Sequence, residues 1–300
     1  MKENVNKNFS VIIPHKNLPV LLQRCLDSIP EREDLEIIIV DDNSDANIVD
    51  FSNFPGKNRK NVKVILDKEG KGAGAARNKG IEEATGKWLL FADSDDRYTS
   101  IFNEFLDKYE TSTADIILFK ANVVCDESTK KITPVMNLFI DNYLNGTSCL
   151  DDLKYGAWEP WNRMIKSSLV RSSNVRFDEI SSSNDKMFSI RLARYFESVE
   201  VSGMVVYDYI LRPNSIIHSG KEKRFLNSFN TILAQNSIYH EIGYKRKFFM
   251  PYFFLSHYKY LNKDIFNKYW NYLKKIKANP FEGFIHYFLF HLLIKLRTSR

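Results

Sequence analysis

The sequence predicts an α/β fold with a mostly parallel sheet flanked by helices, and three observations support this prediction. Short β-branched runs alternate with segments of helical periodicity over the first 120 residues, as in proteins whose parallel strands are connected by helices. The strand-like runs are almost wholly apolar, as expected for strands covered on both faces. Several of them end in acidic residues. Because ligands of open sheets of this type bind beyond the carboxyl ends of the strands, we expect the functional site there.

The expected elements follow one another in a regular order. Five strands are expected, at residues 9–14, 35–40, 61–66, 88–92 and 114–119. Apolar residues at helical spacing predict a helix over 18–29. The glycine-rich run KEGKGAGAARNKGIEEA (residues 68–84) predicts a loop that enters a second helix. Farther along, residues 184–196 have helical periodicity with Asn184 as the expected N-cap, and residues 199–211 alternate like a strand.

Composition favours a soluble globular protein. The chain has 300 residues, of which 44% are hydrophobic and 27% charged, enough to bury a sizeable core. The N-terminus has no apolar run that resembles a signal peptide, and no stretch is long and apolar enough to span a membrane. The three cysteines have no C-x-x-C spacing, which argues against a disulfide framework and a structural zinc site. We therefore expect a cytoplasmic protein.

The net charge of +6 is unevenly distributed. Residues 221–300 carry 15 Lys or Arg against four Asp or Glu, and they hold 20 of the 41 aromatic residues. This predicts a separate, helical C-terminal region after a first domain over residues 1–220. One helical face near its end is apolar: Phe281, Phe284, Ile285, Phe288, Leu292 and Leu296. That face could lie on an anionic membrane surface, or it could pack on the first domain with a basic exterior. No recognised nucleic-acid-binding motif is present, so we expect no nucleic-acid partner.

The stretch KWLLFADSDDRY (residues 87–98) places three carboxylates at the end of a strand. Side chains two apart on an extended segment point to the same side, so Asp93 and Asp95 can face one ligand while Ser94 turns away. Carboxylate oxygens suit Mg²⁺ or Mn²⁺, which commonly bridge protein carboxylates to a diphosphate. A solvated turn is the alternative. Two further strand ends, at residues 14–17 and 41–42, are expected on the same edge, and this convergence favours the metal site.

The glycine-rich run matches neither a Walker A motif nor a dinucleotide fingerprint. Gly70, Gly72 and Gly74 form G-x-G-x-G without a third glycine at the required offset. The run can still bring backbone N–H groups and the positive end of a helix toward an anion, and Arg77 adds a fixed positive charge. Acidic side chains for a metal and basic groups for phosphate together fit a nucleoside diphosphate.

In their order and spacing, VIIPHKN, IIIVDDNSD, GAGAARNKG and LLFADSDD resemble the family 2 glycosyltransferases of bacterial polysaccharide synthesis, which have the Rossmann-like GT-A fold. The resemblance covers roughly residues 9–220. It implies a nucleotide-binding part over about 1–110 and an acceptor part over about 111–220. It also implies an inverting hexosyltransferase that moves a sugar from a nucleotide-diphosphate donor, usually UDP-linked, to a hydroxyl of a glycan or lipid-linked acceptor. A cytoplasmic site at the inner face of the membrane would suit a lipid-linked acceptor.

The resemblance also implies roles for individual residues. Asp95 would ligate Mn²⁺ or Mg²⁺, and Asp185 would be the catalytic base. His218, in RPNSIIHS, is a further candidate for contact with the metal or a phosphate. The expected nucleotide-binding residues are Pro14, His15, Asn17, Asp42, Gly74, Arg77, Asp93 and Ser94.

The chain departs from the family's pattern at three places. Asn43 replaces the usual glycine after the paired aspartates, so the turn there can differ. His15 and Lys16 replace an aromatic residue that often precedes the first asparagine. Asn184 stands before Asp185, where many members have a glutamate.

Other interpretations are weaker. A phosphatase of the haloacid-dehalogenase type would carry its aspartate pair on the first strand. A nucleotidyltransferase would have a glycine-rich, basic segment directly after that strand, where this chain has HKNLPV. A non-catalytic nucleotide-sugar-binding protein would differ only in showing no turnover. Trp158 and Trp161 could stack on a sugar or pack in the core.

Overall fold

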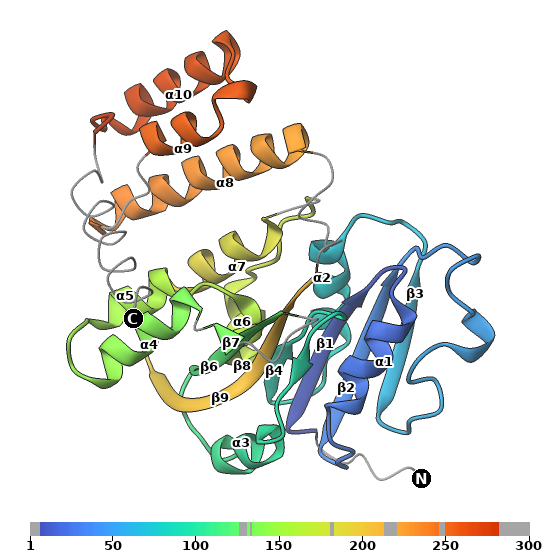
Figure 1. The fold of residues 1–300 in the computed structure, drawn as a ribbon. Coiled ribbons are helices and arrows are strands. Elements are labelled where there is room, and N and C mark those ends of the chain that lie inside the picture. The colour runs from blue at the N-terminus through green and yellow to red at the C-terminus, as the bar shows by residue number, and fades with distance from the viewer. Residues whose placement is uncertain are drawn as a thin grey trace. The chain divides into compact units, whose positions relative to one another are not determined.

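The computed structural model describes residues 7–125, 131–132, 134–180, 183–212, 221–245 and 250–281. The chain divides into two compact units, Met1–Ser215 and Ile216–Arg300, called unit 1 and unit 2 below. Unit 1 contains the strands, and the described part of unit 2 is helical (Figure 1).

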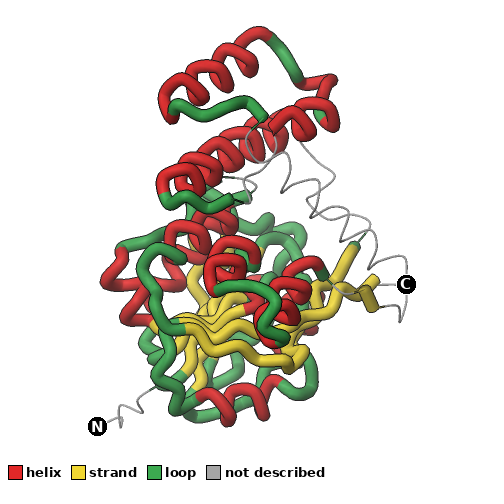
Figure 2. The backbone as a smooth tube through the Cα atoms, turned by 90° about the vertical axis from the view of Figure 1, so that its left-hand side faces the viewer, coloured by secondary structure: helices red, strands yellow, loops and turns green. Residues whose placement is uncertain are grey.

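Unit 1 is built on a nine-stranded sheet with the order β3-β2-β1-β4-β8-β6-β9-β5, and β7 pairs with β6. Figure 2 shows these strands as one continuous layer between helices. The strands are β1 (Phe9–His15), β2 (Leu35–Asp42), β3 (Val62–Asp67), β4 (Trp88–Phe91), β5 (Arg97–Tyr98), β6 (Ile116–Cys125), β7 (Lys131–Ile132), β8 (Arg163–Lys166) and β9 (Val199–Leu211).

The predicted α/β architecture is confirmed. Its parallel part consists of β1 to β4, the strands nearest the N-terminus. Strands β1 to β4 pair in parallel, and all seven residues of β1 are buried, which explains its wholly apolar sequence. Beyond β4 the sheet is mixed, because β8 runs antiparallel to both β4 and β6 while β9 runs parallel to β6. The expected strands are all present, and the last of them matches residues 199–211.

Helices cover this sheet. Those of unit 1 are α1 (Pro19–Asp27), α2 (Ala73–Glu83), α3 (Phe102–Tyr109), α4 (Val135–Leu144), α5 (Leu150–Gly156), α6 (Ser167–Ser173) and α7 (Asn184–Leu192). Helix α2 packs against β1 and β2. A 3₁₀ turn, η2 (Pro160–Asn162), packs against α7. The expected N-cap at Asn184 is wrong by one residue: Ser183, in a left-handed conformation with φ 59°, occupies the cap.

Unit 2 has its own hydrophobic core. Its helices are α8 (Lys221–Glu241), α9 (Met250–Ser256) and α10 (Lys263–Ile276). Aromatic side chains from all three meet in this core, among them Phe225, Phe229, Phe253 and Tyr269. The apolar face expected near the end of the chain lies outside the described residues after Phe281. In the described part of the chain, no helix has both the length and the apolar character needed to cross a membrane.

Candidate functional site

The carboxyl ends of β1 and β2 are joined by a buried histidine–aspartate pair. His15 and Asp41 are each only 1% exposed, and His15 Nδ1 lies 2.7 Å from Asp41 Oδ2. The backbone N–H of Leu18 donates to His15 Nε2, so the ring hydrogen is on Nδ1 and is donated to Asp41. Burial alone would raise the pKa of Asp41, but hydrogen bonds from His15 and Ser44 lower it below its usual value. Both ring nitrogens of His15 are therefore engaged in the protein, and His15 shapes this edge from within.

Asp42 connects the end of β2 to the glycine-rich loop. The backbone N–H of Gly72 donates to Asp42 Oδ1 at 2.9 Å, and Lys16 Nζ lies 3.2 Å from Asp42 Oδ2. Neighbouring Pro14 is buried within β1, opposite Val40 of β2. Asp42 is thus placed where three segments of the sequence meet.

Two asparagines make the turns at this edge. Asn17 and Asn43 have φ values of 56° and 57°, in the left-handed region that asparagine tolerates better than most non-glycine residues. Asn17 Oδ1 accepts a hydrogen bond from the backbone N–H of Asp45 at 2.7 Å. The turn after the paired aspartates therefore keeps a glycine-like conformation although Asn43 stands in the glycine position.

Gly74 is required by a close approach between chain segments. It lies in the first turn of α2, and a Cβ at this position would fall well inside contact distance of the Asp178 carbonyl oxygen. The backbone leading toward α7 thus packs directly on the glycine-rich segment. Only a residue without a side chain permits this contact.

The variant Gly74→Ala is expected to lower the free energy of unfolding by about 1–3 kcal/mol, because the backbone of Asp178 would have to move. Urea denaturation measures this change. Gly203→Ala is the matched control: its Cβ would have its nearest neighbour, Leu144, at 3.9 Å, and we expect an effect within about 0.5 kcal/mol. Equal losses in the two variants would contradict the close approach.

Arg77 is a buried cation between the aspartates and α7. It is 5% exposed, and it donates to Asp93 Oδ1 at 2.5 Å and to Asn184 Oδ1 at 2.9 Å. Its guanidinium carbon lies 5.3 Å from the centre of the Phe177 ring. Arg77 therefore links Asp93, one of the two aspartates expected at the metal site, to the start of α7, about 90 residues farther along the sequence.

The three aspartates after β4 have different environments. Asp93 pairs with Arg77, and Asp95 pairs with Arg212 through Oδ2. Asp96 is only 1% exposed; it accepts hydrogen bonds from the Tyr207 hydroxyl at 3.0 Å and the Ile210 N–H at 2.7 Å. Asp96 therefore anchors β9, while Asp93 and Asp95 remain partly exposed at the edge.

The charge at Asp95 is only partly offset. Burial, with the neighbouring charge of Asp93, raises the pKa of Asp95 above its usual value, although Arg212 acts in the opposite direction. Within the described residues, no three His, Cys, Asp or Glu side chains gather as a complete ligand set. A cation here would therefore need oxygens from water or a bound phosphate in addition to Asp95, as is common for Mg²⁺. Ser94, between the two aspartates, is buried.

Asp185 lies in the first turn of α7, partly exposed. Burial raises the pKa of Tyr209 to about 12, and the charges of Asp96, Asp93, Asp95 and Asp185 add to this effect. The negative charges that act on Tyr209 therefore come both from the aspartates after β4 and from Asp185.

The two tryptophans of AWEPWNRM have different environments. Trp161 is 7% exposed and stacks on Tyr207 and Tyr209, with ring centres 5.0 and 5.6 Å apart. Trp158 is partly exposed, and the Lys186 ammonium lies 4.8 Å from its ring centre. Core packing therefore accounts for Trp161, whereas Trp158 belongs to the surroundings of α7.

Sequence reasoning missed several residues of this edge. The sequence places Asp41 at an acidic strand end but does not reveal its pairing with His15. Arg212 follows β9 directly and contacts Asp95 from 117 positions away. The sequence signal for Arg212 is its position as a basic residue at the end of a long predicted strand. His218 lies outside the described residues, and its suggested contact with a metal or phosphate stays a prediction.

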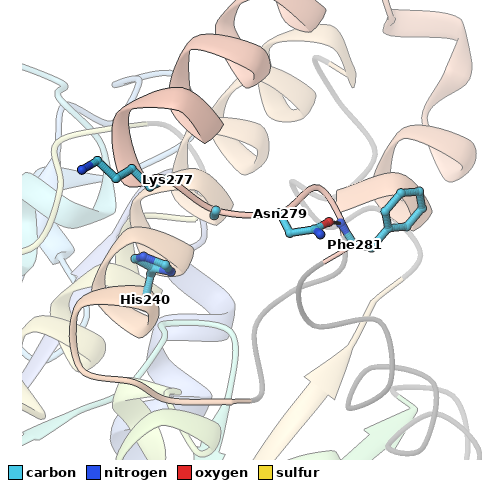
Figure 3. A pocket seen from close by; sticks show the side chains of 5 residues that line it. His240, Lys277, Asn279 and Phe281 are labelled. Atoms are coloured by element: carbon cyan, nitrogen blue, oxygen red, sulfur yellow. Dashed lines mark hydrogen bonds between the residues drawn. The ribbon is translucent and has the colours of Figure 1, made fainter.

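A separate pocket lies within unit 2. It has a volume of about 290 Å³ and is lined by His240, Lys277, Ala278, Asn279 and Phe281. Figure 3 shows these side chains around the turn that follows α10. Phe281 belongs to the apolar face that the sequence predicts near the end of the chain, and the other four are not predicted for a site.

Known proteins share both sequence and fold with this chain. The family model described as glycosyl transferase family 2 matches residues 10–161. The uncharacterized glycosyltransferase EpsJ of Bacillus subtilis is 26% identical over 216 residues, which are 69% of this chain and 62% of the relative. A poly(ribitol-phosphate) beta-glucosyltransferase of Bacillus spizizenii is 30% identical over 207 residues, which are 67% of this chain and 31% of the relative. The chain thus spans less than two thirds of the length of these relatives.

Solved structures share the fold. The crystal structure of S. aureus TarS 1-349 in complex with UDP superposes with a TM-score of 0.60 at 20% identity, covering 90% of this chain and 80% of that chain. The complex of the same protein with UDP-GlcNAc has a TM-score of 0.55 at 20% identity, with 78% and 71% covered. The family match covers more than half of the chain, including the strand ends that carry Asp42, Asp93 and Asp95. The chain therefore belongs to glycosyl transferase family 2, and its fold is that of the GT-A glycosyltransferases.

Proposed function

We propose that the chain is a glycosyltransferase that moves a sugar from a UDP-sugar to a hydroxyl of a glycan or lipid-linked acceptor in cell-surface polysaccharide synthesis. One observation carries this proposal: the ends of β1, β2, β4 and β9 and the start of α2 bring acidic and basic side chains to one edge of the sheet. The glucosyltransferase relative, together with the UDP and UDP-GlcNAc bound by TarS, supports the choice of donor.

The donor would bind along this edge. Asp42 is proposed to accept from the base, since one of its oxygens is already oriented by the Gly72 N–H. Pro14 and Asn17 would form the pocket wall beside it, and the buried His15 would support that wall through its pairing with Asp41. The start of α2, with Gly74 and Arg77, supplies positive potential for phosphates. Asp93 and Ser94 would lie at the ribose side.

A divalent cation would bind at Asp95. Asp95 is a suitable ligand, because a nearby cation stabilises the charged form of a carboxylate whose pKa is raised by burial and by Asp93. Mn²⁺ or Mg²⁺ would offset the charge that develops on the departing diphosphate. Arg212, which contacts Asp95, would share this task. His218 remains a candidate second ligand.

The proposed reaction is a single displacement with inversion at the anomeric carbon. The acceptor oxygen forms the new bond to that carbon while the bond to the diphosphate oxygen breaks, and the electron pair leaves with the diphosphate. Asp185 takes the hydroxyl proton of the acceptor as its oxygen attacks, and a positioned base of this kind contributes roughly 10²–10⁴-fold.

A panel of nucleotide sugars tests the function. Thermal shift is measured for UDP-, GDP- and dTDP-linked sugars with and without Mn²⁺, and release of the nucleotide is followed in the presence of candidate acceptors. Specific stabilisation by one UDP-sugar, followed by acceptor-dependent release of UDP, would support the proposal. Binding without turnover on any acceptor would favour a non-catalytic binder, and stabilisation by no nucleotide would overturn both.

We also propose that unit 2 holds the enzyme at the cytoplasmic face of an anionic membrane. Exposed Phe266 and Trp270 lie on α10 among lysines, and aromatic and basic side chains together favour such surfaces.

Removal of residues 281–300 is expected to weaken binding to vesicles containing anionic lipid roughly 10- to 100-fold, because three basic residues and an apolar face are lost. Sedimentation with vesicles measures this, and activity on a soluble acceptor should be retained. A truncated chain that is insoluble would favour packing of the tail on the protein, and unchanged vesicle binding would exclude the tail as the anchor.

A further inference from the structure

Lys16 follows β1 directly, and the proposed reaction does not use it. Its backbone is held from both sides. His15, the residue before it, pairs with Asp41, and the N–H of Asn17, the residue after it, donates to Ser44 Oγ at 2.8 Å. Both sequence neighbours of Lys16 are thus tied to the end of β2 and the turn that follows it. The position from which the Lys16 side chain leaves the backbone is therefore fixed.

The ammonium of Lys16 is paired with the carboxylate of Asp42. The parallel register of β1 and β2 brings these two residues together at the ends of the strands, and Lys16 Nζ lies 3.2 Å from Asp42 Oδ2. The glycine-rich loop closes on the pair from another side. The Gly72 N–H donates to Asp42 Oδ1 at 2.9 Å, and a Cβ at Gly70 would lie 3.8 Å from Lys16 Nζ. The pair is therefore enclosed by three segments of the chain.

The pair retains hydrogen-bonding capacity. The side chain of Lys16 is 47% exposed, whereas that of Asp42 is 5% exposed. An ammonium group has several N–H donors, and among the described residues the one acceptor recorded for Lys16 is Asp42. A carboxylate accepts up to about four hydrogen bonds, and Asp42 receives two. The pair can therefore offer a donor and an acceptor side by side to a ligand.

The charges of the pair favour a neutral ligand group over an anion. The attraction of Lys16 for a phosphate is offset by the repulsion from Asp42, which lies within hydrogen-bonding distance of it. An adjacent donor and acceptor without net charge suit the polar edge of a nucleobase, because such an edge carries N–H groups and carbonyl oxygens next to each other.

We propose that Lys16 and Asp42 together recognise the base of the donor: Asp42 accepts from a ring N–H, and Lys16 donates to the carbonyl oxygen beside it. This inference rests on the proposed function, in which Asp42 binds the base. Uracil and guanine both carry an N–H beside a carbonyl. Cytosine and adenine have an unprotonated ring nitrogen at the corresponding place, which would face the carboxylate as a second acceptor. A site built to pair with a polar group rejects ligands that lack it, so Lys16 is a specificity-determining residue.

Calorimetric titration of the full chain with UDP, GDP, CDP and ADP in the presence of Mn²⁺ tests the base preference. UDP or GDP should bind roughly 10-fold or more tightly than CDP and ADP, because the mismatched bases leave the pair without partners. Whichever of UDP and GDP binds more tightly identifies the base. Equal affinity for the four nucleotides would overturn the proposal.

The variant Lys16→Met keeps the apolar stem and removes the ammonium. It should weaken binding of the preferred nucleotide roughly 10- to 100-fold and change CDP binding less than about 3-fold, so that selectivity falls. Lys16→Arg keeps a charged donor and should restore part of the selectivity. Lys63→Met is the matched control, since Lys63 is 53% exposed and pairs with Glu83, and it should behave like the parent. Selectivity unchanged in Lys16→Met would overturn the proposal.

Two further ligands separate base recognition from other roles of Lys16. Inorganic diphosphate with Mn²⁺ has no base and should bind the parent and Lys16→Met equally. If diphosphate and nucleotide are weakened to the same extent, Lys16 is a phosphate contact and the proposal is overturned. Methylation of the ring N–H of the preferred base should weaken its binding to the parent roughly 10-fold. This measurement needs no variant, and an unchanged affinity would contradict the contact between the base and Asp42.

Turnover separates this inference from the proposed function. With a nucleotide sugar and an acceptor, Lys16→Met should raise the KM for the donor and leave kcat within about 3-fold, because the contact is made equally in the bound and transition states. If sugar is transferred and Lys16→Met keeps the base preference, the inference fails and the function stands. If the base preference depends on Lys16 but no acceptor receives a sugar, the proposed function fails and the recognition of the base stands.

Discussion

Asp185→Asn is expected to lower sugar transfer roughly 10²-fold or more while donor and metal affinity stay nearly unchanged. The amide keeps the shape of the carboxylate but cannot accept a proton, so the loss falls on the chemical step. The donor side does not depend on this residue, because Asp42, Arg77 and Asp95 are held by other contacts. Steady-state kinetics measures the drop in kcat, and calorimetric titration with UDP and Mn²⁺ measures donor-side affinity.

Asp178→Asn provides the matched comparison. Asp178 lies in the segment before α7, and both of its oxygens accept from Arg191, at 2.6 and 3.3 Å. Because Asp178→Asn breaks this structural ion pair, it should lower the stability of the protein and leave most of the transfer rate. If Asp185→Asn retains full transfer to the natural acceptor, the base lies elsewhere, and Asp178 or its exposed neighbour Glu179 is the next candidate.

Asp95→Ala should remove the metal-dependent part of UDP binding and lower kcat about 10²–10³-fold, since a bound cation supplies several kcal/mol of charge stabilisation in such reactions. The fold should survive, because Asp95 lies at the edge and its side chain supports no core residue. Titration of UDP with and without Mn²⁺ measures the loss. A variant that binds UDP and Mn²⁺ like the parent would show that the metal assignment is wrong.

Substitution of the adjacent residue, Asp96, should lower stability, whereas substitution of Asp95 should lower metal-dependent binding. Asp96 is buried, and its oxygens satisfy the Tyr207 hydroxyl and the Ile210 N–H. Asp96→Ala would leave two buried donors without acceptors, so we expect a loss of about 2–4 kcal/mol in the free energy of unfolding. Comparing the two variants separates a functional carboxylate from a structural one on the same turn.

The parallel half of unit 1 was predictable because its signals are local. Strands buried on both faces need continuous apolar runs, and residues 9–14, 35–40 and 88–92 have them. The convergence of Asp42 and Asp93 followed from the rule that parallel strands share a carboxyl edge. Asn43 could also have been interpreted locally, since asparagine tolerates the left-handed conformation that the structure shows.

The rest depends on pairings between distant segments. Nothing near β8 in sequence indicates that it lies between β4 and β6, because an antiparallel strand of four residues has too short a pattern. The inward orientation of Asp96 depends on Tyr207 and Ile210, more than 100 positions away.

The pairing of β6 with β9 also bears on the order in which the molecule forms. Strands β1 to β3 pair across separations of 25 or 26 residues (Phe9 with Leu35, Ile37 with Val62), whereas Phe9 meets Trp88 after 79 residues and Ile116 meets Val199 after 83. Closing a longer loop costs more chain entropy, and distant pairings slow folding. Strands β1 to β3 therefore have the kinetic advantage, and the contacts of Asp96 with β9 and of Asp95 with Arg212 are completed in a later step. A nascent chain released before β9 is made would carry the paired strands of the nucleotide half but lack the acceptor half that turns them into a catalyst.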